Sequence, residues 1–163
     1  MDIEQISRVT RSKQKARSSY NQMSRWYDLF AGTSERNFMN IGIAELNPQP
    51  GEIILEIGCG TGHGLLALGQ SVSNPGRIFG LDLSEGMLSQ SKNLLRKSNL
   101  TNSIHLQLGD GCHLPYSSNT FSAVFLCFIL ELFDTPDIPL VLRECRRVMK
   151  EKGRIVIVCL NKQ

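Results

Sequence analysis

The chain has 163 residues, a formal net charge of +3, 41% hydrophobic residues and 20% charged residues. This length suits one domain with a substantial core, and the composition is that of an ordinary globular protein rather than a disordered or repetitive one. No apolar run approaches the roughly 20 residues of a membrane-spanning helix, and residues 1–19 lack the apolar stretch of a secretory signal. We therefore expect a protein of the cytoplasm.

The cysteines and the basic residues narrow the expected chemistry. The five cysteines are scattered and form no CxxC or Cys/His cluster, which predicts reduced, mostly buried thiols and no metal site. The basic excess lies within residues 1–36, where Lys and Arg recur between positions 8 and 17. We interpret this cluster as a solvated helix face and expect no nucleic-acid partner, with an anionic membrane surface or nucleic acid as the alternative.

The first 50 residues predict helices and no strand. One helix is expected near residues 3–19 and another near residues 35–46. Pro48 and Pro50 separate this segment from the rest of the chain, because proline interrupts a helix. Residues 1–50 are therefore predicted to form a helical segment that precedes the main domain.

From residue 51 onward, apolar strands alternate with amphipathic helices. The strands are expected at residues 53–57, 77–83, 103–108, 121–128 and 154–160. The helices are expected at residues 63–72, after the capping residue Ser84, and at residues 138–149, where Gly153 follows as a stop. Nearly uniform apolar strands that alternate with helices predict a doubly wound parallel sheet with right-handed crossovers over residues 51–163.

A glycine-rich turn, Gly58-Cys59-Gly60-Thr61-Gly62, follows the first strand and opens a helix. This arrangement is typical of nucleotide binding, because glycine allows positive φ and lets a ligand approach the backbone closely. The spacing is not GxGxxG, since position 63 is His. Glu56 precedes the turn, and Asp82 ends the second strand, where a carboxylate can accept hydrogen bonds from both hydroxyls of a ribose.

Residues 56–62 resemble the signature of class I S-adenosylmethionine-dependent methyltransferases. Residues 80–84 with Met87-Leu88, residues 109–121 and residues 143–153 agree with the same pattern. Together with Tyr27-Asp28, they make residues 20–160 similar to the ubiquinone/menaquinone-biosynthesis methyltransferase branch. The resemblance implies a Rossmann-like sheet of order 3-2-1-4-5, with S-adenosylmethionine as cofactor and S-adenosylhomocysteine as product.

The resemblance also implies a set of cofactor-binding residues. The glycine loop would lie under the methionine part, while Asp82 would hold the ribose hydroxyls, Leu83 the adenine and Asp110 its amino group. Leu126 would line the methionine end, and Tyr27 would close over the cofactor, which makes residues 1–50 a lid. The expected set is Tyr27, Glu56, Gly58, Cys59, Gly60, Thr61, Gly62, Asp82, Leu83, Asp110, Gly111, Cys112 and Leu126. Four assignments have structural alternatives: Gly60 as a residue that permits tight strand–helix packing, Asp82 as a charge at a helix N-terminus, Asp110 as part of an ordinary turn, and Tyr27 as part of a packing seam for the N-terminal helix.

The chain departs from the family pattern in several respects, two of which bear on catalysis and assembly. Glu131 stands where many members carry a His, so no catalytic residue is assigned. Separately, Phe125, Phe128 and Phe133 are expected in the core. Strands six and seven of full members are absent, which leaves the apolar fifth strand as a sheet edge. An apolar edge favours pairing with another chain. We therefore expect either a homodimer through this edge or a fragment of a longer protein.

Methyl transfer from a sulfonium is an in-line displacement that depends mainly on positioning. It needs neither a metal nor a catalytic triad, so we expect an enzyme that methylates a small molecule. The stretch after the fourth strand lacks the Asn/Asp-Pro-Pro-aromatic pattern of enzymes that methylate nucleobase amines. The alternatives are a cofactor-binding module or truncated core without a complete acceptor site, an NAD-type dehydrogenase, and a thiol-based metalloid methyltransferase.

Overall fold

The computed structural model describes residues 13–23, 33–72, 76–100 and 103–159. Tyr27 and most of the helix expected at residues 3–19 lie outside this part. The described helices are α1 Lys13–Met23, α3 Thr33–Leu46, α4 His63–Ser71, α5 Glu85–Lys97, α6 Ile138–Val148 and the short 3₁₀ helices η2 Leu130–Leu132 and η3 Thr135–Asp137. The strands are β1 Ile53–Ile57, β2 Arg77–Asp82, β3 Ile104–Leu108, β4 Phe121–Cys127 and β5 Met149–Val158.

The strands form one parallel five-stranded sheet in the order β3-β2-β1-β4-β5, which confirms the predicted topology. β1 is central, and its Ile54 pairs with Ile78 of β2 on one side and with Ala123 of β4 on the other. A strand with neighbours on both sides and helices on both faces has no solvated face. This explains why residues 54–57 and 123–126 are all buried.

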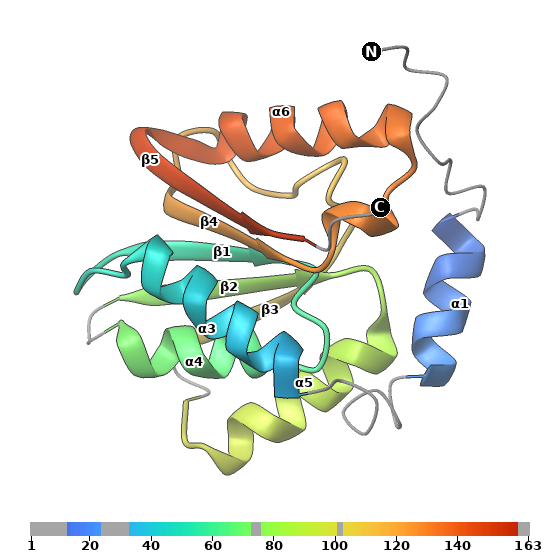
Figure 1. Cartoon of the computed structure of the whole chain (residues 1–163), viewed down its shortest axis with the longest axis horizontal. Coiled ribbons are helices and arrows are strands. Elements are labelled where there is room, and N and C mark those ends of the chain that lie inside the picture. The colour runs from blue at the N-terminus through green and yellow to red at the C-terminus, as the bar shows by residue number, and fades with distance from the viewer. Residues whose placement is uncertain (1–12, 24–32, 73–75, 101–102, 160–163) are drawn as a thin grey trace.

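Helices cover the two faces of the sheet unequally (Figure 1). On one face, α3, α4 and α5 enclose a core that includes Leu46, Leu68 and Leu95. On the other face, α6 packs through Val141, Cys145 and Val148. These three α6 positions recur at spacings of four and three residues, so they form one apolar stripe.

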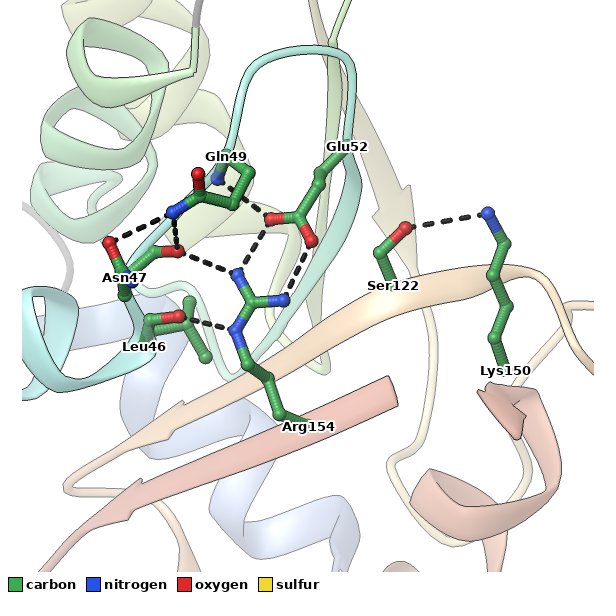
Figure 2. Close-up of polar contacts among 7 residues, drawn as sticks. All are labelled: Leu46, Asn47, Gln49, Glu52, Ser122, Lys150 and Arg154. Carbon is green, nitrogen blue, oxygen red and sulfur yellow. Dashed lines mark hydrogen bonds and ion pairs between the residues drawn. The ribbon is translucent and has the colours of Figure 1, made fainter. Parts of the chain in front are cut away.

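Arg154 of β5 joins the end of α3 to the start of β1 (Figure 2). Its guanidinium donates to the carbonyl oxygens of Leu46 and Asn47 and forms a two-pronged ion pair with Glu52, with distances of 2.6 and 2.7 Å. The hydrogen bond from Arg154 is the largest cause that lowers the pKa of Glu52. Figure 2 also shows Gln49 donating its backbone N–H to the same carboxylate. The cluster therefore fixes α3 against the β5 edge of the sheet.

The fifth strand begins earlier than the sequence predicts. α6 ends at Val148 rather than at residue 149, and strand pairing starts at once, because Met149 is buried opposite Phe121. The register then shifts, and regular pairing resumes at Arg154. Gly153 therefore lies in an irregular part of β5 and does not end the helix. The other predicted strands agree with the structure to within one residue.

Among the described residues, no helix combines the length and the apolar character needed to cross a bilayer. In the same part of the chain, no group of three or more His, Cys, Asp and Glu side chains is arranged to hold a metal ion. All five cysteines are free thiols.

Candidate functional site

The carboxyl ends of β1 to β4 meet along one edge of the sheet. The chain runs from β1 through β2 to β3 on one side and through β4 to β5 on the other, so the strand order reverses between β1 and β4. Ligands of open α/β sheets bind in the crevice at such a switch point. The residues that follow β1 and β4 are Gly58 and Phe128, and they define this crevice.

The loop after β1 folds against the end of β2. The N–H groups of Gly58 and Cys59 donate to the carbonyl of Leu81 at 2.7 and 3.1 Å. Gly58 has φ 71°, and a Cβ at this position would collide with the side chain of Ile129. Gly60 has φ 52°, and a Cβ there would project into open space. Glycine at position 60 therefore leaves free the space beside the loop that a ligand would use.

Asp82 ends β2 and joins the loop to the next helix. Its carboxylate accepts the N–H of Gly60 at 2.8 Å and the N–H of Ser84 at 2.8 Å. Burial raises the pKa of Asp82, although these hydrogen bonds partly offset that rise. The side chain is 9% exposed and lines the cavity described below. Asp82 thus shapes the glycine loop in addition to the ligand contact expected of it.

Asp110 follows β3 and serves a local turn while it faces the same crevice. Its carboxylate accepts the N–H of Cys112 at 2.9 Å, and Nδ1 of His113 lies 3.9 Å from its second oxygen. Asp110 and Gly111 line the cavity, whereas Cys112 is buried in the core. The turn and the cavity-lining position expected of Asp110 are therefore compatible.

Glu56 is a buried acid directly beneath the glycine loop. It is 4% exposed, and its Oε2 atom has no hydrogen-bond partner within the described structure. Burial, and then the negative charge of Asp82, raise the pKa of Glu56 to about 8. A buried carboxyl with an unsatisfied oxygen costs stability unless a partner reaches it. A ligand cation, such as the ammonium of an amino acid, would supply that partner.

A cavity occupies the crevice and opens to solvent, with about 980 Å³ of empty space that includes its open mouth. It combines carboxylates at the ends of β2 and β3 with apolar side chains and two further aspartates from the segment after β4. The lining residues are Tyr20, Ile57, Gly58, Gly60, Leu81, Asp82, Leu83, Met87, Gly109, Asp110, Gly111, Cys127, Phe128, Ile129, Leu132, Phe133, Asp134 and Asp137.

A second cavity of about 590 Å³ lies on the other side of the glycine loop, against α3. We call the first the Asp82 cavity and the second the Glu56 cavity. The lining of the Glu56 cavity brings charged residues of α3 next to the buried acid. Its residues are Glu35, Arg36, Met39, Glu56, Gly58, Cys59, Gly60, Thr61, His63, Gly64, Cys127 and Phe128.

Most of the residues expected from the sequence lie on these two cavities. Gly62, Cys112 and Leu126 are buried and line neither cavity. Leu126 is followed by Cys127 and Phe128, and these two residues line both cavities. Tyr27 lies outside the described residues.

The sequence reasoning missed the wall that the loop after β4 contributes. Phe128 and Phe133, which we expected in the core, are half-buried and line the Asp82 cavity. The apolar run that continues past the end of β4 is the signal that points to this wall. It also suits a buried strand, and this is why its function is not evident from the sequence.

The first described helix also reaches the Asp82 cavity. Asn21 of α1 accepts hydrogen bonds from the Ser84 hydroxyl at 2.6 Å and from the N–H of Gly86 at 3.0 Å. Arg17 forms an ion pair with Glu85 at 2.5 Å. These contacts attach α1 to the N-terminus of α5, next to Asp82, and bring Tyr20 to the cavity wall.

Comparison with known proteins identifies the family. A family model described as a methyltransferase domain matches residues 54–153. The chain belongs to this family. Within this family, relatives of the chain are named demethylmenaquinone methyltransferases.

Two relatives are demethylmenaquinone methyltransferases. The protein from Lactobacillus johnsonii is 34% identical over 139 residues, which cover 85% of this chain and 55% of the relative. The protein from Halalkalibacterium halodurans is 39% identical over 116 residues, which cover 71% of this chain and 45% of the relative. The chain thus spans about half the length of the curated relatives it matches.

Solved structures share the fold at lower identity. A SAM-dependent methyltransferase from Aquifex aeolicus has a TM-score of 0.65 at 22% identity, covering 78% of this chain and 67% of its own. The cyclase SpnF has a TM-score of 0.75 at 19% identity, covering 86% of this chain and 57% of its own. Because one of these neighbours is a cyclase, the fold alone does not define the reaction.

Proposed function

We propose that this methyltransferase binds S-adenosylmethionine across the glycine loop and transfers its methyl group to a small-molecule acceptor by in-line displacement. The main support is the pair of cavities beside the loop, one with Asp82 and Asp110 and the other with the buried, unpartnered oxygen of Glu56. Family membership supports the same cofactor.

The described residues fit the two ends of this cofactor. Asp82 has the position to accept hydrogen bonds from the ribose hydroxyls, and Leu83 and Asp110 lie beside it for the adenine. Glu56 offers a carboxylate oxygen to the ammonium of the methionine part. When bound, the cofactor supplies an electrophilic methyl group on a positively charged sulfur. The residues of the chain then have to orient the acceptor and exclude water, which are the main sources of rate in such a displacement.

The names of the relatives suggest a first candidate for the methyl acceptor. Their printed name, demethylmenaquinone methyltransferase, makes demethylmenaquinone the acceptor to test first. The half-buried side chains of Phe128, Ile129 and Phe133 offer an apolar wall of the kind that an aromatic ring would contact.

A second candidate function is cofactor binding without a complete acceptor site. It is favoured by the length of the match, since the chain spans about half of the relatives. Titration calorimetry with S-adenosylmethionine, S-adenosylhomocysteine and NAD tests the cofactor, and turnover with demethylmenaquinone in its oxidised and reduced forms tests methyl transfer. Binding without turnover of any acceptor favours this second candidate, and binding of NAD alone refutes both.

We further propose that residues 1–50 act as a lid over the cofactor. The support is the attachment of α1 to α5 through Asn21 and the position of Tyr20 in the cavity wall. Asn21→Ala, which removes this attachment, is expected to weaken S-adenosylmethionine binding several-fold. Gln22→Ala, an exposed position on the same helix, is the control and leaves binding unchanged. Equal affinities for the two variants contradict the lid.

Two further proposals concern the assembly and its compartment. The β5 edge, where Ile157 is 36% exposed, supports a homodimer through strand pairing, and light scattering that shows a monomer refutes it.

The free thiols support a location in the cytoplasm, because disulfides are rare in reducing compartments. If the tagged protein is found in an oxidising compartment of its cell, this assignment is wrong.

A further inference from the structure

The Asp82 cavity and the Glu56 cavity share four lining residues, Gly58, Gly60, Cys127 and Phe128. In S-adenosylmethionine, the sulfonium joins the adenosyl part to the methionine part. If the cofactor extends across both cavities, as the proposed function requires, its sulfur lies at this junction. The four shared residues are therefore the ones next to the charge that methyl transfer removes.

Only one of the four shared residues is suited to recognise a cation. The two glycines carry no side chain. Burial, and then the carboxylates of Glu56, Glu131 and Glu35, raise the pKa of Cys127 to about 12, so its thiol is neutral at physiological pH. A neutral thiol offers neither a counter-charge nor a strong nucleophile. Phe128 carries an aromatic ring, whose face attracts cations.

The backbone of Phe128 is held in a conformation that aromatic residues rarely adopt. Its φ is 53°, and its N–H donates to the carbonyl of Val158 at 2.8 Å. Non-glycine residues in the left-handed region cost on the order of 1–3 kcal/mol and persist where the surroundings fix them. Here the surrounding sheet fixes Phe128 at the switch point, between both cavities.

We propose that Phe128 is a specificity-determining residue that recognises the sulfonium charge of the cofactor through its aromatic ring. The ring attracts the cationic S-adenosylmethionine but has no such attraction for the neutral thioether of S-adenosylhomocysteine. Phe128 thereby favours binding of the substrate form and release of the product form.

The test compares the two ligands on the cofactor-free protein by titration calorimetry, without any acceptor. The measured quantity is the ratio of the dissociation constant of S-adenosylhomocysteine to that of S-adenosylmethionine. Phe128→Leu keeps an apolar side chain without the ring, and we expect it to lower this ratio by about 2- to 30-fold. Phe128→Tyr keeps the ring and preserves the ratio. Phe133→Leu, an aromatic position that lines only the Asp82 cavity, changes both affinities by the same factor.

The outcomes separate this inference from the proposed function. A wild-type protein that binds neither ligand overturns both. A wild-type protein that binds both ligands, with the same ratio in Phe128→Leu, overturns only the role of Phe128. An equal fall of the ratio in the Leu and Tyr variants also overturns it, because packing rather than the ring would then be responsible. Matching thermal unfolding midpoints of the variants establish that each comparison is made on folded protein.

Discussion

Glu56→Gln tests the electrostatics of the site without a cofactor. The substitution keeps the shape of the side chain and removes its titration. The pKa of Glu56 is raised from an ordinary 4.5 to about 8 by burial and by Asp82, so the folded state favours the protonated carboxyl. The stabilisation from this carboxyl is complete below the unfolded pKa and is lost as pH rises to the folded pKa. One pKa unit corresponds to about 1.36 kcal/mol, so the wild type loses about 4 kcal/mol of unfolding free energy, relative to Glu56→Gln, between about pH 5 and pH 8.

Urea unfolding of both proteins at several pH values measures this difference. Asp82→Asn is the companion variant: it removes the second cause of the raised pKa of Glu56, so the pH-dependent loss becomes smaller but persists. A difference between wild type and Glu56→Gln that stays constant with pH refutes the reasoning.

The same carboxyl links cofactor binding to proton release. At pH 7 the Glu56 carboxyl is largely protonated, and an ammonium beside it favours the ionised form. S-adenosylmethionine binding should therefore release a proton from the wild type, and its affinity should rise from about pH 6 to pH 7.5. Calorimetry in two buffers of different ionisation enthalpy detects the proton, and the Glu56→Gln variant should release none.

Three other substitutions probe separate parts of the structure. Asp82→Ala should weaken S-adenosylmethionine binding by about 1.5–3 kcal/mol, and an unchanged affinity by calorimetry contradicts the assignment of Asp82 to the ribose hydroxyls. Because Asp82 also accepts hydrogen bonds from the N–H groups of Gly60 and Ser84, amide exchange in the glycine loop should accelerate in this variant. Gly60→Val should abolish cofactor binding, since its side chain would enter the open space beside the loop and its φ is 52°; a folded variant with normal affinity disproves this. Arg154→Ala should lower the free energy of unfolding by about 1–3 kcal/mol, with Arg154→Lys losing less, and urea unfolding that shows no change argues against the clamp on Glu52.

The strands of the sheet are predictable from the sequence because each signal is local, and their order is what the family resemblance implies. The apolar run of β1, the glycine loop and the acid at the end of β2 lie within residues 53–82. A parallel sheet then brings the strand ends to one edge without further information. For this reason Asp82 and Asp110 are found on one cavity although 28 positions separate them.

The parts that the sequence does not reveal depend on contacts between distant segments. Leu126 and Phe128 are both apolar and close in sequence, yet one is fully buried and the other lines both cavities. The difference follows from the left-handed backbone at Phe128, which redirects the chain after β4. Likewise, the attachment of α1 through Asn21 depends on the N-terminus of α5, 63 positions away, and composition carries no sign of it.

The contacts of Arg154 with Leu46, Asn47 and Glu52 affect how the chain folds. Arg154 follows its ion-pair partner Glu52 by 102 positions and Leu46 by 108. Contacts of such long sequence separation require the entropy of a large loop to be lost before they form, and they slow folding. During synthesis, α3 and β1 leave the ribosome long before β5 exists. The hydrogen bonds from Arg154 to the end of α3 can therefore form only after the residues of β5 have been made. We expect the α3–β5 contact to form late, after the pairing of β1 with β2.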